Sequence, residues 1–387
     1  MSKLFEKIRK FKTIFSHPSI GKNARIFRLL KNVLPYYLFR DGRAFYPLNV
    51  YFIVNNICNL KCNMCDVGTK NTNGSFAQNL GSGQENYLTN ERIKAIIDEI
   101  AFFKPAVGFT STEPLLRKDI TGLVSYTLNK GLEVLITTNG YLLENFAQEF
   151  VDIGLDKLCV SIDGPKEVHN TIRGKDDVFQ RATKGIKLVN EFKKKSNKTK
   201  PRILINYTIT NYNYAHLCEL VESIKDIGVD QINFQLTQFM TEEMAQVHNK
   251  QWGNKYFATQ TCVGQGIDLS KVDINILHEQ ILILKDKYPQ LCVFLFDINK
   301  DTLKTYFGDC LKFVNNVKCV FPWFLAQVKN TGELIGLTRC YSVILGDLKN
   351  NSFTNEWNGD KMKQFRRDLK KFGRFPGCSR CEGILYR

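Results

Sequence analysis

A short cysteine-rich stretch constrains this sequence most strongly. Residues 51–65 read YFIVNNICNLKCNMC, so a β-branched and aromatic run leads directly into Cys58, Cys62 and Cys65. The spacing C-x3-C-x2-C supplies three thiolates, whereas a structural zinc ion or a 4Fe-4S cluster usually takes four protein ligands. A 4Fe-4S cluster on this loop would keep one iron open to another ligand. From the loop alone, half of a zinc site or ordinary buried thiols are the alternatives.

The cysteine content points to metal binding in a reducing compartment. The chain has 387 residues and 12 cysteines, and its length suits one large domain or two domains. We find no run of about 18 apolar residues that predicts a membrane-spanning helix. The first 30 residues lack the apolar core and cleavage site of a signal peptide. We therefore expect a cytoplasmic protein without a disulfide framework.

The N-terminal segment 1–47 is strongly basic. It holds eleven Lys or Arg against Glu6 and Asp41, and so contributes +9 of the net charge of +16. Four apolar residues fall on one face of an expected helix: Leu4, Ile8, Phe11 and Phe15. We favour docking of this helix on the protein's own core, with an acidic lipid surface or an acidic partner as alternatives. No zinc finger or RNA-recognition signature supports nucleic-acid binding.

Beyond the cysteine loop, strand and helix patterns alternate. The expected strands are 106–110, 133–138, 157–162, 203–210 and 231–236, and helical patterns begin near 118, 142, 179 and 215. Together with the first strand before the cysteine loop, these βα steps predict an α/β protein with a six-fold partial (β/α)6 TIM-type barrel. Ligands of such folds bind at the carboxyl ends of the strands.

Short polar motifs follow three of these strands. They are TSTEP at 110–114, which contains Glu113, TTNG at 137–140, and SIDGP at 161–165. Each motif is also a strong local turn signal, so its residues alone do not separate a turn from a binding site. Their shared place after the strands favours a site.

The cysteine spacing and these motifs together resemble the radical S-adenosylmethionine (radical SAM) enzymes. The resemblance implies that the open iron binds the amino and carboxylate groups of S-adenosylmethionine, and that the reduced cluster cleaves this cofactor to a 5'-deoxyadenosyl radical. It also implies a flavodoxin or ferredoxin as electron donor. The sequence departs from the family pattern at Met64, where an aromatic residue is usual, and at Ser111 and Thr112, which replace glycines.

The resemblance also assigns roles to individual residues. Glu113 would accept a hydrogen bond from the methionine amino group, and Arg173 would pair with the methionine carboxylate, assisted by Ser161. His169 is expected to hold its loop rather than bind metal. The implied cofactor-binding set is Glu113, Asn139, Ser161, Asp163, Arg173 and Asn206.

The C-terminal region carries a second group of cysteines. Cys319, Cys340, Cys378 and Cys381 could close either a zinc site or a 4Fe-4S cluster by spacing alone. With the surrounding CVFPW, LGDL and EWN motifs, they resemble the SPASM extension of radical SAM enzymes. This resemblance implies one auxiliary 4Fe-4S cluster on these four cysteines, with Cys310 as an alternative ligand.

We expect four regions, and we place the substrate between the barrel and the extension. The regions are a basic helical segment 1–47, the barrel 48–240, a substrate-side linker 241–308 and the SPASM-like region 309–387. Residues 66–86 are expected to form a loop, and 241–266 an irregular, polar and aromatic segment. Within that segment, Cys262 is a candidate hydrogen-atom or proton donor, with a small buried side chain as the alternative.

The expected function is that of a radical SAM oxidoreductase or maturase. Its substrate is expected to be a peptide or protein that is cross-linked, oxidised or epimerised. A sugar-like or phosphate-bearing metabolite is the alternative substrate. The alternative from another functional class is a non-enzymatic metal-binding protein or a basic nucleic-acid-binding protein. Iron and sulfide content separates these classes.

Overall fold

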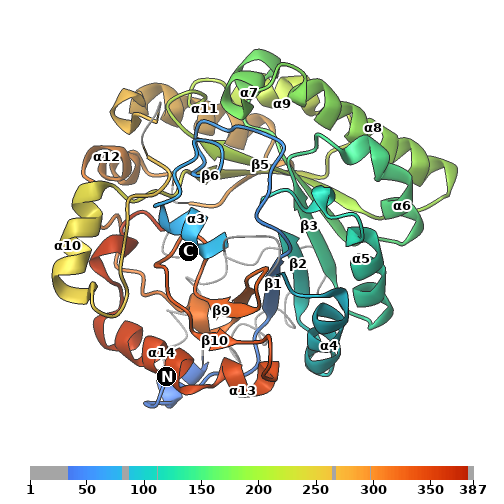
Figure 1. Cartoon of the computed structure of the whole chain (residues 1–387). Helices are drawn as coiled ribbons and strands as arrows, with labels where there is room; N and C mark the ends of the chain where they lie inside the picture. The colour runs from blue at the N-terminus through green and yellow to red at the C-terminus, as the bar shows by residue number, and fades with distance from the viewer. Residues whose placement is uncertain (1–33, 81–86, 111, 264–266, 297, 382–387) are drawn as a thin grey trace.

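The fold is built around one large sheet (Figure 1). The computed structural model describes residues 34–80, 87–110, 112–263, 267–296 and 298–381. The strand order is β10-β9-β8-β1-β2-β3-β4-β5-β6-β7. The strands are β1 (Asn49–Ile53), β2 (Ala106–Thr110), β3 (Val134–Thr138), β4 (Lys157–Ser161), β5 (Arg202–Ile209), β6 (Gln231–Leu236), β7 (Cys292–Phe294), β8 (Leu325–Val328), β9 (Glu333–Ile335) and β10 (Gly346–Asp347).

Strands β1 to β6 confirm the predicted partial (β/α)6 barrel. Each of them pairs in parallel with the next along the chain. Two further parallel strands extend the sheet, because β7 pairs with β6 and β8 pairs with β1. Strands β9 and β10 continue beyond β8 as antiparallel pairs. The C-terminal region therefore joins the barrel through a shared sheet.

Helices cover the outer side of the barrel strands (Figure 1). The helices are α3 (Ser75–Leu80), α4 (Asn90–Ala101), α5 (Ile120–Asn129), α6 (Ala147–Asp152), α7 (Lys166–Arg173), α8 (Val178–Lys195), α9 (Leu217–Ile224), α10 (Glu242–Trp252), α11 (Ile274–Lys287), α12 (Lys300–Gly308), α13 (Phe353–Trp357) and α14 (Asp360–Phe372). The basic amphipathic helix expected in 1–47 lies mostly outside the described residues, which begin at 34. Within the described ranges, no helix is long and apolar enough to cross a membrane.

Two segments expected to be irregular contain helices. The 66–86 loop includes α3, and the 241–266 segment begins with α10. Helix α10 starts where the Thr241 hydroxyl accepts a hydrogen bond from the Met244 backbone N–H at 3.2 Å. Two glutamates in its first turn complement the helix dipole. The expectation of an irregular 241–266 segment is therefore wrong for its first half, because this cap outweighs the mixed composition.

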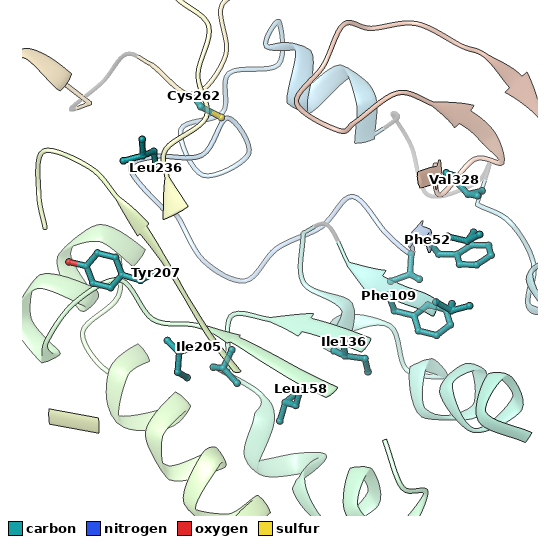
Figure 2. Close-up of a cluster of buried hydrophobic side chains, with 14 of the residues drawn as sticks. Phe52, Phe109, Ile136, Leu158, Ile205, Tyr207, Leu236, Cys262 and Val328 are labelled. Atoms are coloured by element: carbon teal, nitrogen blue, oxygen red, sulfur yellow. The ribbon is translucent and has the colours of Figure 1, made fainter. Parts of the chain in front are cut away.

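The core lies between the strands and their outer helices (Figure 2). Phe52, Phe109, Ile136, Leu158 and Ile205 follow one another on β1 to β5, and each is at most 2% exposed. Burial of a side chain of this size contributes roughly 1.5–3 kcal/mol to stability. Side chains alternate along a strand, so the neighbouring positions face the barrel interior.

Polar bonds fix the C-terminal region against the start of the described chain. The Trp357 indole N–H donates to the Phe45 carbonyl at 2.8 Å. The fully buried Arg366 donates through Nε to the Pro322 carbonyl at 2.8 Å and through Nη1 to Asn358 Oδ1 at 3.0 Å. Burial lowers the pKa of Arg366 to about 9. The Trp357 bond ties α13 to the segment that enters β1, and the Arg366 bond to Pro322 ties α14 to the segment that enters β8.

Candidate cofactor and iron-sulfur sites

The three cysteines of the first loop open onto a single cavity. This cavity has a volume of about 280 Å³ and lies where several barrel strands end. The predicted site residues in its lining are Cys58, Cys62, Cys65, Asn139, Ser161, Arg173 and Asn206. Met64 lines it as well. The structure therefore brings together most of the residues that the sequence motifs singled out.

Arg173 reaches this cavity from the end of α7. Its guanidinium forms an ion pair with Asp163, and its Nη1 lies 3.9 Å from Cys62 Sγ. Asp163 is fully buried and accepts a hydrogen bond from the Thr208 backbone N–H at 2.8 Å. Asp163 therefore lies behind the cavity wall, where it holds Arg173 in place.

Glu113 is also buried behind the wall. Its carboxylate accepts hydrogen bonds from Thr138 Oγ1 at 2.7 Å, from the Asn139 backbone N–H at 2.7 Å and from the Leu115 backbone N–H at 3.0 Å. Burial raises the pKa of Glu113 to about 7, and the three donors oppose that shift because they favour the ionised form. The neighbouring Ser111 lies outside the described residues.

Asn139 joins the cysteine loop to the end of β3. Its Nδ2 donates to Asn59 Oδ1 at 2.8 Å and lies 3.8 Å from Cys58 Sγ. Its Oδ1 accepts from the Tyr141 backbone N–H at 2.9 Å. The glycine that follows, Gly140, has φ +79°, a left-handed conformation that glycine adopts without strain. The Asn-Gly motif is thus both a turn and part of the cavity.

His169 supports the Arg173 loop from within. Its Nδ1 accepts a hydrogen bond from the Asp163 backbone N–H at 3.0 Å, and the ring is fully buried. Burial lowers the pKa of His169 well below its usual range, and the charge of Arg173 acts in the same direction. A neutral imidazole is required for this bond, so His169 acts as a fixed acceptor.

Burial in the first cavity favours the protonated form of the Cys58 and Cys62 thiols. Burial raises the pKa of Cys62 to about 12, against the opposing effect of Arg173. Burial raises the pKa of Cys58 as well. Iron binds the thiolate and offsets this desolvation. Three thiols on one cavity wall, beside a guanidinium, fit a 4Fe-4S cluster with an open iron.

The four C-terminal cysteines line a second, apolar cavity. Cys319, Cys340, Cys378 and Cys381 surround a volume of about 30 Å³, together with Phe321, Ile335, Tyr341, Phe365 and Phe375. Burial raises the pKa of Cys340 to about 12, and the nearby Cys378 adds to this shift. Cys310 lies outside this lining, and its Sγ contacts Thr241 Oγ1 at 3.8 Å.

This donor set fits an iron-sulfur cluster better than a single ion. Among the described residues, no three His, Cys, Asp or Glu side chains converge on one ion position. A cluster separates its thiolates more widely than one ion does.

A buried arginine anchors the C-terminal cysteine pair, and sequence reasoning missed it. Arg380 lies between Cys378 and Cys381 and is fully buried. Its Nε donates to the Tyr306 carbonyl at 2.7 Å, and its Nη2 donates to the Thr305 carbonyl at 2.8 Å. These carbonyls belong to the last turn of α12, where a cation is favourable. The sequence feature that could have identified Arg380 is the presence of an arginine inside the C-x2-C motif.

Cys262 is buried close to the first cavity. Its thiol contacts the guanidinium of Arg339, and its backbone N–H donates to Asp66 Oδ1 at 2.8 Å. Arg339 lines the cavity, whereas Cys262 lies outside that lining. Arg339 therefore stands between this thiol and the cavity.

Comparison with known proteins identifies two domains. Residues 52–224 match the radical SAM superfamily, and residues 319–382 match an iron-sulfur cluster-binding domain, SPASM. The chain therefore combines a radical SAM domain with a C-terminal SPASM domain. The two matches cover the cysteine loop and the four C-terminal cysteines respectively.

The curated relatives are enzymes that share part of the chain. Fe-coproporphyrin III synthase of Methanosarcina barkeri is 29% identical over 203 residues, which are 52% of this chain and 46% of that protein. The AdoMet-dependent heme synthase of the same organism is 30% identical over 44% of this chain and 45% of that protein. The probable GTP 3',8-cyclase of Methanocaldococcus jannaschii is 28% identical over 45% of this chain and 54% of that protein. The chain thus spans about half the length of these relatives.

Solved structures share the fold over a larger part of the chain. Streptococcus suis SuiB bound to S-adenosylmethionine has a TM-score of 0.59 at 15% identity, and the likeness covers 95% of this chain and 78% of that one. AnSMEcpe bound to AdoMet and the Cp18Cys peptide has a TM-score of 0.55 at 15% identity, with 82% of each chain covered. At this identity, the likeness establishes the fold alone.

Proposed function

We propose that this chain is a radical SAM enzyme that modifies a peptide or protein substrate. The observation that carries the proposal is the convergence of Cys58, Cys62, Cys65 and Arg173 on one cavity. The two domain matches support it. When bound and reduced, an iron-sulfur cluster and S-adenosylmethionine would supply the 5'-deoxyadenosyl radical that abstracts a hydrogen atom from the substrate.

The chain's own residues would bind and orient these groups. Cys58, Cys62 and Cys65 would hold the first cluster, and Asn139 already hydrogen-bonds across to their loop. Arg173 offers a fixed guanidinium for a carboxylate, since the Asp163 ion pair holds it against the cavity wall. Glu113 fixes the end of β3 through its hydrogen bonds from Thr138 and Asn139. Ser161 and Asn206 place polar groups on the same wall.

Cys319, Cys340, Cys378 and Cys381 would hold an auxiliary cluster beside the barrel. Strand β8 pairs with β1, so the region that carries these cysteines shares one continuous sheet with the barrel. A peptide substrate is supported by the similar structures, which include SuiB bound to its precursor peptide SuiA. The named relatives include an Fe-coproporphyrin III synthase and a probable GTP 3',8-cyclase, which makes a small metabolite the second candidate substrate.

Iron content and cofactor cleavage test the proposal. We expect the protein reconstituted under nitrogen to bind about eight irons, as two 4Fe-4S clusters require. After reduction by a flavodoxin or ferredoxin, it should form 5'-deoxyadenosine from S-adenosylmethionine. Stoichiometric zinc with no 5'-deoxyadenosine would contradict the proposal and favour a structural metal-binding protein.

A further inference from the structure

A third cavity lies in the interior of the barrel. It has a volume of about 510 Å³, within the range of ordinary ligand pockets, and its lining includes inward side chains of β1, β3, β5, β6 and β8. Thr137, Asn206, Gln235 and Arg339 line both this cavity and the thiol-lined one. A molecule in the barrel interior would therefore reach the wall that carries Cys58, Cys62 and Cys65.

Carboxamides line one side of the interior. Strand β6 reads QINFQL, and its alternate residues Gln231, Asn233 and Gln235 line the cavity, while Ile232 and Phe234 are fully buried in the core. Asn206 lies beside Asn233 on β5, in register with it. The interior of this part of the barrel is thus polar and uncharged.

These carboxamides are held in a hydrogen-bonded row. Gln231 Nε2 donates to Asn233 Oδ1 at 2.5 Å, Asn233 Nδ2 donates to Asn206 Oδ1 at 3.1 Å, and Gln235 Nε2 donates to Thr208 Oγ1 at 2.9 Å. A carboxamide has one acceptor oxygen and two donor hydrogens, so each retains capacity for a ligand. Gln231, Asn233 and Asn206 are preorganised because each fixes the orientation of the next, and Gln235 is held separately by Thr208.

On the strand beside β1, Gln327 presents an unsatisfied acceptor. Gln327 lines the same cavity from β8 and is 5% exposed. Its Nε2 donates to Thr338 Oγ1 at 2.6 Å, whereas its Oε1 has no hydrogen-bond partner among the described residues. Buried polar atoms are normally paired. A ligand N–H or O–H would complete this group.

Charge is sparse in this cavity. Among the described residues that line it, Glu133, Lys157 and Arg339 carry charge. Glu133 and Lys157 form an ion pair with each other. Arg339 belongs to the end shared with the thiol-lined cavity. Apolar side chains, among them Leu135, Leu204 and Phe324, line much of the rest of the cavity. The interior therefore suits an uncharged ligand that carries both polar and apolar groups.

The spacing of the β6 row matches an extended peptide. Residues two apart on a strand lie roughly 6.6 Å apart on one face, and an extended chain repeats its peptide groups over the same interval. A carboxamide offers a donor and an acceptor side by side, as a peptide group does. We propose that the barrel interior binds an extended, uncharged segment of a peptide substrate through its backbone, with Asn233 and Gln327 as binding residues. This inference rests on the proposed peptide-modifying function.

Binding of synthetic probes to the reconstituted holoenzyme tests this inference. The probe is an acetylated and amidated octapeptide of alternating Ser and Gly, measured by equilibrium dialysis with S-adenosylmethionine under nitrogen. Two comparison ligands are measured in the same way. The first is the same chain with glycolate in place of each Gly, which removes alternate backbone N–H groups. The second is cellotetraose. We expect the octapeptide to bind, the glycolate chain to bind at least about tenfold more weakly, and cellotetraose not to bind.

Variants locate the binding in the barrel. Asn233→Leu keeps the side-chain size and should weaken octapeptide binding about tenfold. If the Asn233→Leu variant has a lowered melting temperature, Asn233→Ser replaces it in the binding measurement. Gln246→Leu is the matched control, because Gln246 is exposed on α10, and it should bind like the wild type. An unchanged affinity in both Asn233 variants overturns the inference, as does equal binding of the glycolate chain.

The outcomes separate this inference from the proposed function. Cellotetraose binding that depends on Asn233, with no peptide binding, would assign the cavity to a carbohydrate and overturn the peptide inference. A wild-type holoenzyme that forms 5'-deoxyadenosine but binds none of the peptides also overturns it, while the radical chemistry stands. Absence of 5'-deoxyadenosine would instead contradict the proposed function itself.

Discussion

The guanidinium of Arg173 forms an ion pair with Asp163, and both groups are largely withdrawn from solvent. The side chain of Arg173 is 10% exposed and that of Asp163 is 0% exposed. Arg173 therefore has two tasks in this structure. It neutralises a buried carboxylate, and it presents a positive group to the cavity that the three cysteines line. A variant that removes Arg173 leaves Asp163 without its partner and also takes the positive group from the cavity. Stability and cofactor binding must therefore be measured separately.

Replacing Arg173 with Ala should weaken S-adenosylmethionine binding and destabilise the fold. A lost charge-assisted contact lowers affinity roughly ten- to a hundredfold. The unpaired Asp163 should also cost about 3–5 kcal/mol of unfolding free energy, because its charge would be buried without a partner. Denaturant unfolding and equilibrium dialysis of the reconstituted protein measure the two effects.

A double variant separates these effects. Arg173→Ala combined with Asp163→Asn removes the buried charge, and the carbonyl oxygen of the introduced amide can still accept from the Thr208 N–H. We expect most of the stability to return while the cofactor affinity stays low. Arg181→Ala is the control, because its ion pair with Asp177 is exposed, and it should change neither quantity appreciably. Wild-type affinity in the double variant would show that Arg173 serves the fold alone.

The two cysteine groups should differ in what their loss removes. Cys62→Ala should abolish 5'-deoxyadenosine formation, since it takes a ligand from the cavity beside Arg173. Cys378→Ala with Cys381→Ala should lower the iron content from about eight to about four and abolish product formation. This double variant should retain some uncoupled cleavage of S-adenosylmethionine. Iron analysis and chromatography of 5'-deoxyadenosine measure these outcomes.

Folding must be checked in the same samples. Metal binding contributes folding free energy, so a stripped site can unfold its surroundings. Circular dichroism and gel filtration identify that case. A folded Cys378→Ala, Cys381→Ala protein that forms product at the wild-type rate would exclude the auxiliary cluster from the reaction.

Arg380 should stabilise the C-terminal cysteine loop. Arg380→Met fills a similar volume but leaves the Thr305 and Tyr306 carbonyls without their charged donor. We expect a loss on the order of 3 kcal/mol of unfolding free energy and slower binding of the auxiliary iron. Lys371→Met on α14 is the control, because Lys371 is exposed. Equal iron uptake and equal stability in the two variants would show that the arginine anchor is dispensable.

The strands of the barrel could be predicted because their patterns are local. The expected 106–110 and 231–236 strands coincide with β2 and β6. A run of β-branched residues followed by a polar turn is enough to define such an element. The cysteine spacing is equally local, and so the first loop could be assigned from residues that are adjacent in the chain.

Long-range pairings could not be predicted in the same way. Strand β8 pairs with β1 although the paired residues are 276 positions apart in the chain, with Leu325 opposite Asn49. Neither segment contains a sequence feature that specifies the other as its pairing partner, because a short apolar strand can pair with many sheet edges. The Asp163 ion pair was missed for a related reason. The motif predicted that both Asp163 and Arg173 contact the cofactor, whereas their contact with each other depends on how α7 folds back over β4.

The pH dependence of stability should report on His169. In the unfolded chain a histidine titrates near pH 6.5, whereas burial and Arg173 hold the pKa of folded His169 well below that. Below pH 6.5 the unfolded state therefore binds a proton that the native state does not. The unfolding free energy of the protein should then fall by up to about 1.4 kcal/mol per pH unit as the pH drops from 6.5 toward the pKa of folded His169. The full contribution of His169 to stability should be present above pH 6.5.

His169→Asn tests this, because the Asn Oδ1 can take the place of Nδ1 as acceptor for the Asp163 N–H and does not titrate. Denaturant unfolding of the reconstituted protein at several pH values between 5 and 8 gives the slope for each form. We expect the variant to lose less stability than the wild type between pH 6.5 and 5. His278→Asn on α11, where the side chain is only partly buried, is the control for the loss of a histidine elsewhere in the chain. If the wild type and His169→Asn lose stability in parallel, His169 is protonated in the folded protein, and the fixed-acceptor role fails with it.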